Sequence, residues 1–402
     1  MSSKVLEPKA RLVLILNALY MTADALCSVF VAVYLWKSGQ RFEVVCYHYL
    51  AIFAVTPVVF LFAGWYSQAR DRVHMYRLGL FFHAVYYAAI LLLQERSVVY
   101  AAPLGALLGM TWGFFWAGNN VFHYDATNAD NREYYFGWLT AVSSTARLVA
   151  PAIAGLLIQY LPDNRAGYHV IFFLALCIFL AAIVLSWWMP HDRTRRPFRI
   201  KRALFPGPEQ HDWRLIMAAA LALAGAFQLF HVLLGLIMFM ETSREGDVGL
   251  FASGQALVTI AVAYIAGRLI VPRNRKRAMF LGSMALLAGG VLTFIQINLY
   301  TLIAFGFLRS VATPLFQIPH LSARFQVIDQ SVETPTQRIE YIAAWEVPLA
   351  IGRLVMMGLL VALYLLIGEW GLRITLLLLC VNRFLAYLLV ARTSVVREHD
   401  AP

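Results

Sequence analysis

The sequence predicts an all-α membrane protein with twelve transmembrane helices in two pseudo-symmetric six-helix bundles. Three observations predict this fold: an apolar composition, twelve long apolar segments and an internal repeat. Of the 402 residues, 61% are hydrophobic and 14% are charged, whereas soluble domains have about 45–50% apolar and about 25% charged residues. The composition therefore indicates an integral membrane protein, and the length suits two membrane-embedded halves.

Twelve apolar segments are each long enough to cross about 30 Å of hydrocarbon as a helix. In chain order they cover residues 12–36, 43–67, 77–95, 98–121, 135–160, 168–189, 215–240, 248–271, 278–297, 299–319, 341–367 and 373–391. Residues 191–214 contain no such segment and are rich in arginine and proline. We therefore predict an N-terminal six-helix bundle over residues 1–190, a cytoplasmic basic linker over residues 191–214 and a C-terminal six-helix bundle over residues 215–402.

The predicted loops differ strongly in their content of lysine and arginine. With the N-terminus inside the cell, 22 of the 33 Lys and Arg residues lie in inner segments and only 6 lie in outer loops. Basic loops remain on the cytoplasmic side of a membrane. We therefore predict a multi-pass protein of the cell membrane with both termini in the cytoplasm. Because topology accounts for the net charge of +11, we expect no nucleic-acid partner.

Two pairs of similar stretches lie at nearly the same separation along the chain. The stretch "RDRVHMYRLG" starts at Arg70 and matches "RNRKRAMFLG", which starts at Arg273. In the same way, "ARLV" around Arg147 matches "GRLV" around Arg353. Two matches at one separation predict two halves in the same orientation, a plan in which carriers bind their substrate near the membrane midplane.

The chain resembles the major facilitator superfamily over essentially its whole length, with six spans, a long basic loop and six further spans. The loop after the second span keeps Gly64, Asp71 and Arg72 of a family motif. The fifth span is similar to a family pattern of small residues around a proline, and the matching positions are Gly137, Ala146, Ala150, Pro151, Ala154 and Gly155. The resemblance implies transport by alternating access, with conformational gating by Asp71, Arg72, Arg132 and Pro151.

Arginine side chains inside the predicted spans are the first candidates for a functional site. Arg147 and Arg353 lie at equivalent positions of the repeat, and Arg309 lies near the middle of its span. An arginine at the membrane midplane costs on the order of 3 kcal/mol unless it is paired or hydrated. Because a guanidinium binds carboxylate and phosphate with parallel hydrogen bonds, we predict that these residues bind an anionic substrate group. Salt bridges within the protein are the structural alternative.

Polar and aromatic side chains recur at helical spacing on the helices that line the cavity in this family. The spacing keeps each set on one helix face. The fourth span contributes Trp112, Trp116 and Asn119, the seventh Gln228 and His231, and the tenth Arg309, Thr313, Gln317 and His320. The predicted substrate-binding residues are Arg147, Arg353, Arg309, Trp112, Trp116, Asn119, Gln228, His231 and Gln317. Ordinary hydrogen bonding between helices is the alternative.

Two carboxylates are candidates for proton coupling. Asp24 is the only charged residue between Leu12 and Trp36, and a lone carboxylate in an apolar environment can take up a proton near neutral pH. Glu346 lies two helical turns before Arg353 on the same face of its helix, where the two could share a water chain. A fixed ion pair with an arginine is the alternative for Asp24.

The sequence contains neither a P-loop nor a common hydrolase motif. We therefore predict a secondary active transporter, coupled to protons, that moves a small organic anion. Efflux of amphipathic drugs and flipping of a lipid remain open, and an intramembrane enzyme or a receptor is a further alternative. The expected partners are a small-molecule substrate, a proton or other coupling ion and the lipid bilayer. We expect a monomer with no catalytic residue, metal or cofactor.

Overall fold

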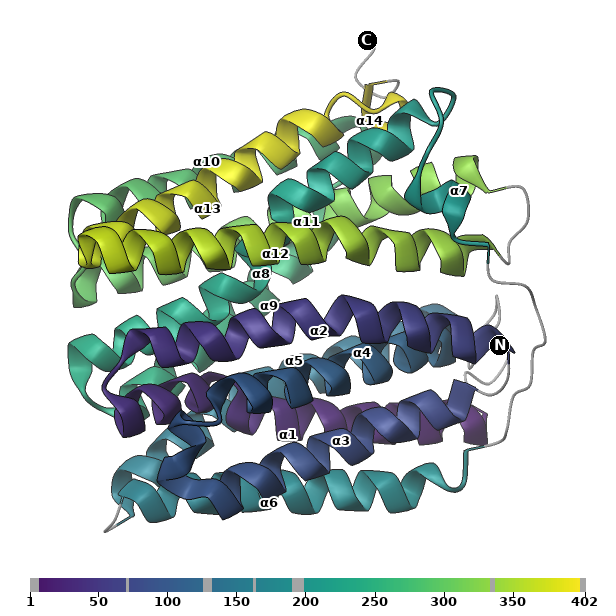
Figure 1. Ribbon diagram of the computed structural model, residues 1–402. Helices are drawn as coiled ribbons and strands as arrows, with labels where there is room; N and C mark the ends of the chain where they lie inside the picture. Colours follow the sequence, from purple (N-terminus) through teal and green to yellow (C-terminus); the bar gives the residue numbers. More distant parts are fainter. Residues whose placement is uncertain are drawn as a thin grey trace. The chain divides into compact units, whose positions relative to one another are not determined.

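The protein is described by a computed structural model over residues 7–69, 72–125, 132–161, 164–189, 199–332 and 337–397. All regular secondary structure in these ranges is helical. The long helices are α1 (Pro8–Gly39), α2 (Phe42–Ala69), α3 (Arg72–Leu93), α4 (Ala101–Asp125), α5 (Arg132–Tyr160), α6 (Asn164–Ser186), α8 (His211–Thr242), α9 (Glu245–Leu269), α10 (Arg275–Ile295), α11 (Leu299–Ser331), α12 (Arg338–Ile367) and α13 (Glu369–Val390) (Figure 1). The short helices are η1 (Gln94–Val98), α7 (Lys201–Leu204), η2 (Pro272–Asn274) and α14 (Ser394–Arg397).

Eleven stretches of the described residues are long and apolar enough to cross a membrane. Each coincides with a long helix, and α4, which overlaps the predicted fourth segment, is the long helix outside this set. The chain is therefore a multi-pass membrane protein, while a count of twelve spans stays a prediction. α11 continues to Ser331, well beyond the predicted apolar segment that ends at residue 319, although it contains Pro314 and Pro319.

The chain forms two compact units. The N-terminal unit comprises Met1–Phe198 and Arg244–Ser253, and the C-terminal unit comprises Arg199–Ser243 and Gly254–Pro402. In the N-terminal unit, α4 packs along α2 and α3, while α1 packs along α5 and α6. In the C-terminal unit, α8 packs along α12 and α13, and α10 packs along α11 and α13.

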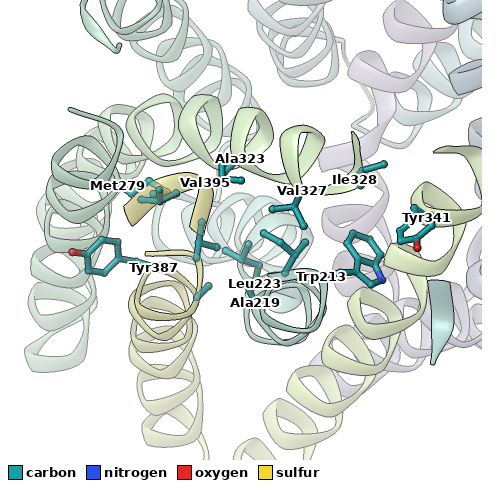
Figure 2. Close-up of a cluster of buried hydrophobic side chains, with 14 of the residues drawn as sticks. Trp213, Ala219, Leu223, Met279, Ala323, Val327, Ile328, Tyr341, Tyr387 and Val395 are labelled. Carbon is teal, nitrogen blue, oxygen red and sulfur yellow. The ribbon is translucent and has the colours of Figure 1, made fainter. Parts of the chain in front are cut away.

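The described part of the predicted linker belongs to the core of the C-terminal unit. The backbone N–H of Arg199 donates to Glu340 Oε1 at 2.7 Å, and Trp213 Nε1 donates to the carbonyl of Ala203 at 2.8 Å. The Trp213 side chain is fully buried, and its ring meets that of Tyr341 at a centroid distance of 5.0 Å. Figure 2 shows both rings at one end of a buried hydrophobic cluster that extends to Tyr387. Residues 190–198 lie outside the described ranges.

Replacing Trp213 with alanine is expected to destabilise the C-terminal unit by about 3–5 kcal/mol, as for other buried aromatic residues. The substitution leaves a cavity in the cluster and removes the hydrogen bond to Ala203. Thermal unfolding of the purified protein in detergent measures the effect. Trp188→Ala is the control, because the Trp188 side chain is 68% exposed. Equal unfolding temperatures for the two variants would contradict the assigned role of Trp213.

Candidate functional site

The membrane-spanning helices of the C-terminal unit carry a group of basic side chains. Arg309, His320 and Arg324 come from α11, where the spacing of 309, 320 and 324 places them on one helix face. Arg353 comes from α12 and Arg383 from α13. We refer to these five residues together with Glu346 as the arginine cluster.

Glu346 is the carboxylate of the arginine cluster. Its Oε2 atom lies 3.5 Å from Nη1 of Arg353, and the two side chains are 23% and 10% exposed. The charge of Glu346 also acts on Arg324, whose guanidinium carbon lies 3.9 Å from the ring centroid of Trp345. One carboxylate therefore serves two guanidinium groups, and for Arg353 the salt bridge considered as an alternative is present.

The remaining arginines contact an amide and an aromatic ring. Arg309 is half-buried and donates from Nη1 to Gln255 Oε1 at 2.8 Å. Arg383 is buried and lies over the ring of Phe316 at 5.1 Å. Electrostatic interactions link Arg383 both to Arg309 and to His320. For Arg309, the amide partner positions the side chain without cancelling its charge.

The arginine cluster has an excess of positive charge. Arg309, Arg324 and Arg353 are accompanied by one carboxylate among the cluster members, Glu346, so these four residues carry a net positive charge even with Arg383 left out of the count. Unpaired charges in a membrane-spanning segment are unfavourable and face one another, water or a ligand. A bound anion would stabilise this arrangement.

In the N-terminal unit, the candidate charged residues are Asp24 and Arg147, which carry opposite charges and form no ion pair within 4 Å among the described residues. Asp24 on α1 is half-buried, whereas Arg147 on α5 is exposed. The charge of Arg147 acts on Asp24. One turn from Arg147, Ser143 donates to Asn17 Oδ1 at 3.4 Å. The Arg147 environment therefore differs from that of its repeat equivalent, because Arg353 is buried beside a carboxylate of its own helix.

The predicted aromatic stripe of α4 contacts α1. The rings of Tyr20 and Phe115 are stacked at 3.5 Å, and Trp116 meets the edge of Tyr20 at 5.9 Å. Trp112 and Trp116 are half-buried, whereas Asn119 is fully buried. Both amide atoms of Asn119 have no hydrogen-bond partner among the described residues, which makes this side chain free to bind a polar group.

The candidates on α8 and the remaining one on α11 differ in exposure. His231 is exposed, and Gln228 and Gln317 are half-buried. The Oε1 atom of Gln228 is buried and has no hydrogen-bond donor among the described residues. Arg309 and Arg353 both belong to the arginine cluster, while no hydrogen bond or ion pair among the described residues connects Gln228 or Gln317 to it.

Of the predicted gating residues, Pro151 is described in full. Pro151 is buried in α5, and its carbonyl oxygen lies close to Gly249 of α9. A Cβ atom added at Gly249 would overlap that oxygen. Next to it, the N–H of Ala152 donates to Ser253 Oγ at 3.1 Å. Arg72 and Arg132 begin α3 and α5, but their side chains lie outside the described part, as does Asp71 altogether.

An ion pair that the sequence did not indicate holds the first turn of α9 in the N-terminal unit. Lys37 Nζ lies 2.7 Å from Glu245 Oε1, and Tyr168 donates its hydroxyl to the same oxygen at 3.3 Å. Glu245 is 2% exposed and Lys37 is 33% exposed. Lys37 and Glu245 are far apart in the chain and lie at helix ends, so periodicity carried no signal for them.

Sequence analysis also did not identify Arg324, a member of the arginine cluster, or Trp345, whose ring contacts Arg324. Arg324 lies beyond the apolar part of α11, and Trp345 lies within an apolar stretch of α12. The helical spacing of Arg324 from Arg309 and Gln317 was the signal that could have identified it.

Charged side chains inside membrane-spanning helices often mark the path of a substrate or an ion. The chain belongs to the Major Facilitator Superfamily, whose family model matches residues 13–318. A relative from Bacillus subtilis (strain 168), the uncharacterised protein YqgE, is 31% identical over 378 residues. The match covers 94% of this chain and 88% of the relative.

Solved transporter structures share the fold. A bacterial homologue of the iron transporter ferroportin, in an inward-facing state, matches with a TM-score of 0.71 and 16% identity over 96% of this chain and 98% of that one. The peptide transporter POT in complex with sulfate matches with a TM-score of 0.72 and 11% identity over 97% of this chain and 95% of that one. At these identities the similarity shows the fold alone.

Proposed function

We propose that the protein is a proton-coupled secondary transporter that moves a small organic anion across the cell membrane by alternating access. The observation that carries this proposal is the excess of arginine over carboxylate in the arginine cluster. A negatively charged substrate would compensate that excess, and guanidinium groups bind carboxylate and phosphate groups well.

The predicted residues take separate roles in this proposal. Arg353 binds the acidic group, Arg309 adds a second positive charge to the substrate-binding site, and Arg147 binds a second polar group. Asn119 and Gln228, whose buried polar atoms have no partner among the described residues, bind neutral polar groups. Trp112, Trp116, His231 and Gln317 complete the substrate contacts.

In the membrane, the chain changes between its two states through the predicted gating residues. Asp71, Arg72, Arg132 and Pro151 act in gating, both termini lie in the cytoplasm, and the protein works as a monomer. It acts as a carrier rather than as an enzyme, without a cofactor or nucleic-acid partner.

Other cargoes fit the arginine cluster less well. One structural neighbour is a homologue of an iron transporter, but a metal cation would be repelled by the net positive charge of the cluster. Amphipathic drugs need an apolar site, and they would not compensate buried guanidinium groups. An anionic lipid would satisfy the same arginines, and competition by lipid in the binding assay distinguishes it from a soluble anion.

A thermal-shift screen of the purified protein tests the proposed substrate class. A ligand that binds only the folded state raises the unfolding temperature. We expect organic anions to raise it and their neutral amides or esters to leave it unchanged. Stabilisation by cations or neutral amphiphiles, without any by anions, would contradict the proposal.

The coupling role of Asp24 is tested in proteoliposomes with a radiolabelled anion identified by that screen. Asp24→Asn should abolish accumulation driven by a pH gradient, because the amide cannot carry a proton, and should leave substrate counterflow intact. Glu95→Gln is the control, since Glu95 is an exposed residue that pairs with Arg165. Equal loss of accumulation and counterflow would indicate a structural Asp24, and full accumulation would indicate Glu346 as the coupling residue.

A further inference from the structure

Three buried N–H donors around the arginine cluster have no acceptor within the part of the chain that the structure describes. They are Nε of Arg324, Nε of Arg353 and Nε1 of Trp345, which lack a hydrogen-bond partner among the described residues. A buried donor without a partner costs about 1–3 kcal/mol. Three such donors in one region indicate that a group rich in acceptor atoms belongs there.

Contacts of Trp345 and Glu346 link the three donor residues. Trp345 precedes Glu346 in the chain, and its ring carries the Arg324 guanidinium at 3.9 Å. Arg353 approaches Glu346 through Nη1, and the Glu346 charge acts on Arg324 as well. The donors therefore come from α11 and α12, and each donor residue is linked to the segment Trp345–Glu346 by a ring contact, an ion pair or its place in the chain.

Glu346 satisfies this donor group incompletely. Its separation of 3.5 Å from Arg353 Nη1 exceeds the 2.7–2.9 Å that is usual for a charged N–H···O hydrogen bond. Burial of Arg353 to 8% exposure excludes most bulk water as an alternative partner. An oxyanion offers several acceptor lone pairs in a small volume and carries the missing negative charge.

We propose that Arg324, Trp345 and Arg353 form an oxyanion subsite in the C-terminal unit, and that Glu346 occupies the place of the ligand's charged group in the empty site. The inference rests on the proposed function, and it names the subsite that receives the acidic group of the transported anion. The ligand group is a carboxylate or a phosphate. It accepts hydrogen bonds from the two guanidinium groups and from the indole N–H.

This arrangement makes Glu346 a competitor of the ligand. When Glu346 is neutral, Arg353 loses its ion pair and the charge that acts on Arg324 disappears, so both arginines are available to the oxyanion. Removing the charge of Glu346 therefore strengthens oxyanion binding. If Glu346 instead only held Arg353 in the geometry that binds the ligand, removing its charge would weaken oxyanion binding. The sign of the change separates the two roles.

The experiment uses the purified full-length protein in detergent, with acetate and inorganic phosphate as probes. Each probe is titrated while the thermal unfolding temperature is followed. Glu346→Gln is expected to tighten binding of the preferred probe by about tenfold, because a like charge is removed from the subsite. Trp345→Phe keeps the ring but loses the N–H, and it is expected to weaken binding roughly threefold to tenfold. Arg324→Lys should weaken it as well, because lysine lacks the planar fork.

The chain offers a matched control for these substitutions in the neighbouring pair Glu369 and Trp370. Both are exposed, and Arg373 contacts both, with an ion-pair distance of 3.7 Å to Glu369 and a cation–ring distance of 4.9 Å to Trp370. Glu369→Gln and Trp370→Phe make the same chemical changes outside the subsite. We expect them to leave the affinity for both probes unchanged.

The outcomes distinguish the subsite from the proposed function. Weaker or unchanged binding in Glu346→Gln, or unchanged binding in Trp345→Phe, would overturn the subsite while anion transport could still be measured in proteoliposomes. Absence of binding and transport of any anion by the unmodified protein would overturn the proposed function itself. If Glu346→Gln does not fold, the Trp345→Phe result decides, since that variant keeps the charge pair.

Discussion

Replacing Lys37 with alanine is expected to destabilise the N-terminal unit by about 3 kcal/mol. The substitution removes the ammonium group that lies 2.7 Å from Glu245 Oε1 and leaves a carboxylate that is 2% exposed without its cation. Breaking a buried ion pair from one side costs about 3–5 kcal/mol, and the partial exposure of Lys37 places the effect at the lower end of that range.

Backbone packing adds to the effect, because it keeps Glu245 from moving to water. A Cβ atom at Gly155 would overlap the carbonyl of Glu245, so α5 and the first turn of α9 are in direct contact. The N–H of Gly246 also donates to Gln159 Oε1 at 3.0 Å. The carboxylate therefore remains buried when its partner is removed.

Thermal unfolding of Lys37→Ala, Glu245→Gln and the double variant measures this interaction. The double variant should be more stable than Lys37→Ala, because it contains no unpaired buried charge. Arg41→Ala is the control, since Arg41 is 70% exposed and lies 3.7 Å from Glu43. A loss for Lys37→Ala no larger than that for Arg41→Ala would show that the pair does not stabilise the unit.

Arg353→Ala is expected to weaken oxyanion binding by about 2–4 kcal/mol, as when one partner of a desolvated charge pair is truncated. This corresponds to a loss of affinity of roughly 30-fold to 1000-fold. Arg353→Lys should lose less, because the charge is kept while the planar fork is lost. The same thermal-shift titrations with acetate and inorganic phosphate measure both variants.

The Arg353 variants also separate recognition from structural clamping. For recognition, the protein should remain folded and lose affinity in both variants. If Arg353→Ala fails to fold and Arg353→Lys keeps full affinity, the salt bridge with Glu346 is a structural clamp. Arg373→Ala is the control, because Arg373 contacts the exposed Glu369 and Trp370 instead of the subsite. The same substitutions at Arg147 test its predicted role as the repeat equivalent of Arg353.

Much of the candidate site could be identified from the sequence because apolar spans make any charge within them conspicuous. Arg309, Arg353 and Glu346 were identified in this way, and the spacing of Glu346 and Arg353 placed both on one helix face. Their pairing at 3.5 Å is consistent with that spacing. Arg324 was not identified, because it lies on a helical extension outside the apolar segment, where a basic residue resembles an ordinary loop charge.

The helical spans, the membrane location and the family follow from the amino-acid sequence, because hydrophobic length and short motifs are read within one stretch of the chain. Hydrophobic length sets whether a segment can cross a bilayer, and that length is present in the order of residues alone. Pairing between distant residues depends instead on how helices pack. Lys37 meets Glu245, and Arg324 meets Trp345, only after α1 and α9, or α11 and α12, have been brought together. Such contacts have no periodic signal in the chain, because their geometry is created by packing between helices rather than by spacing within one.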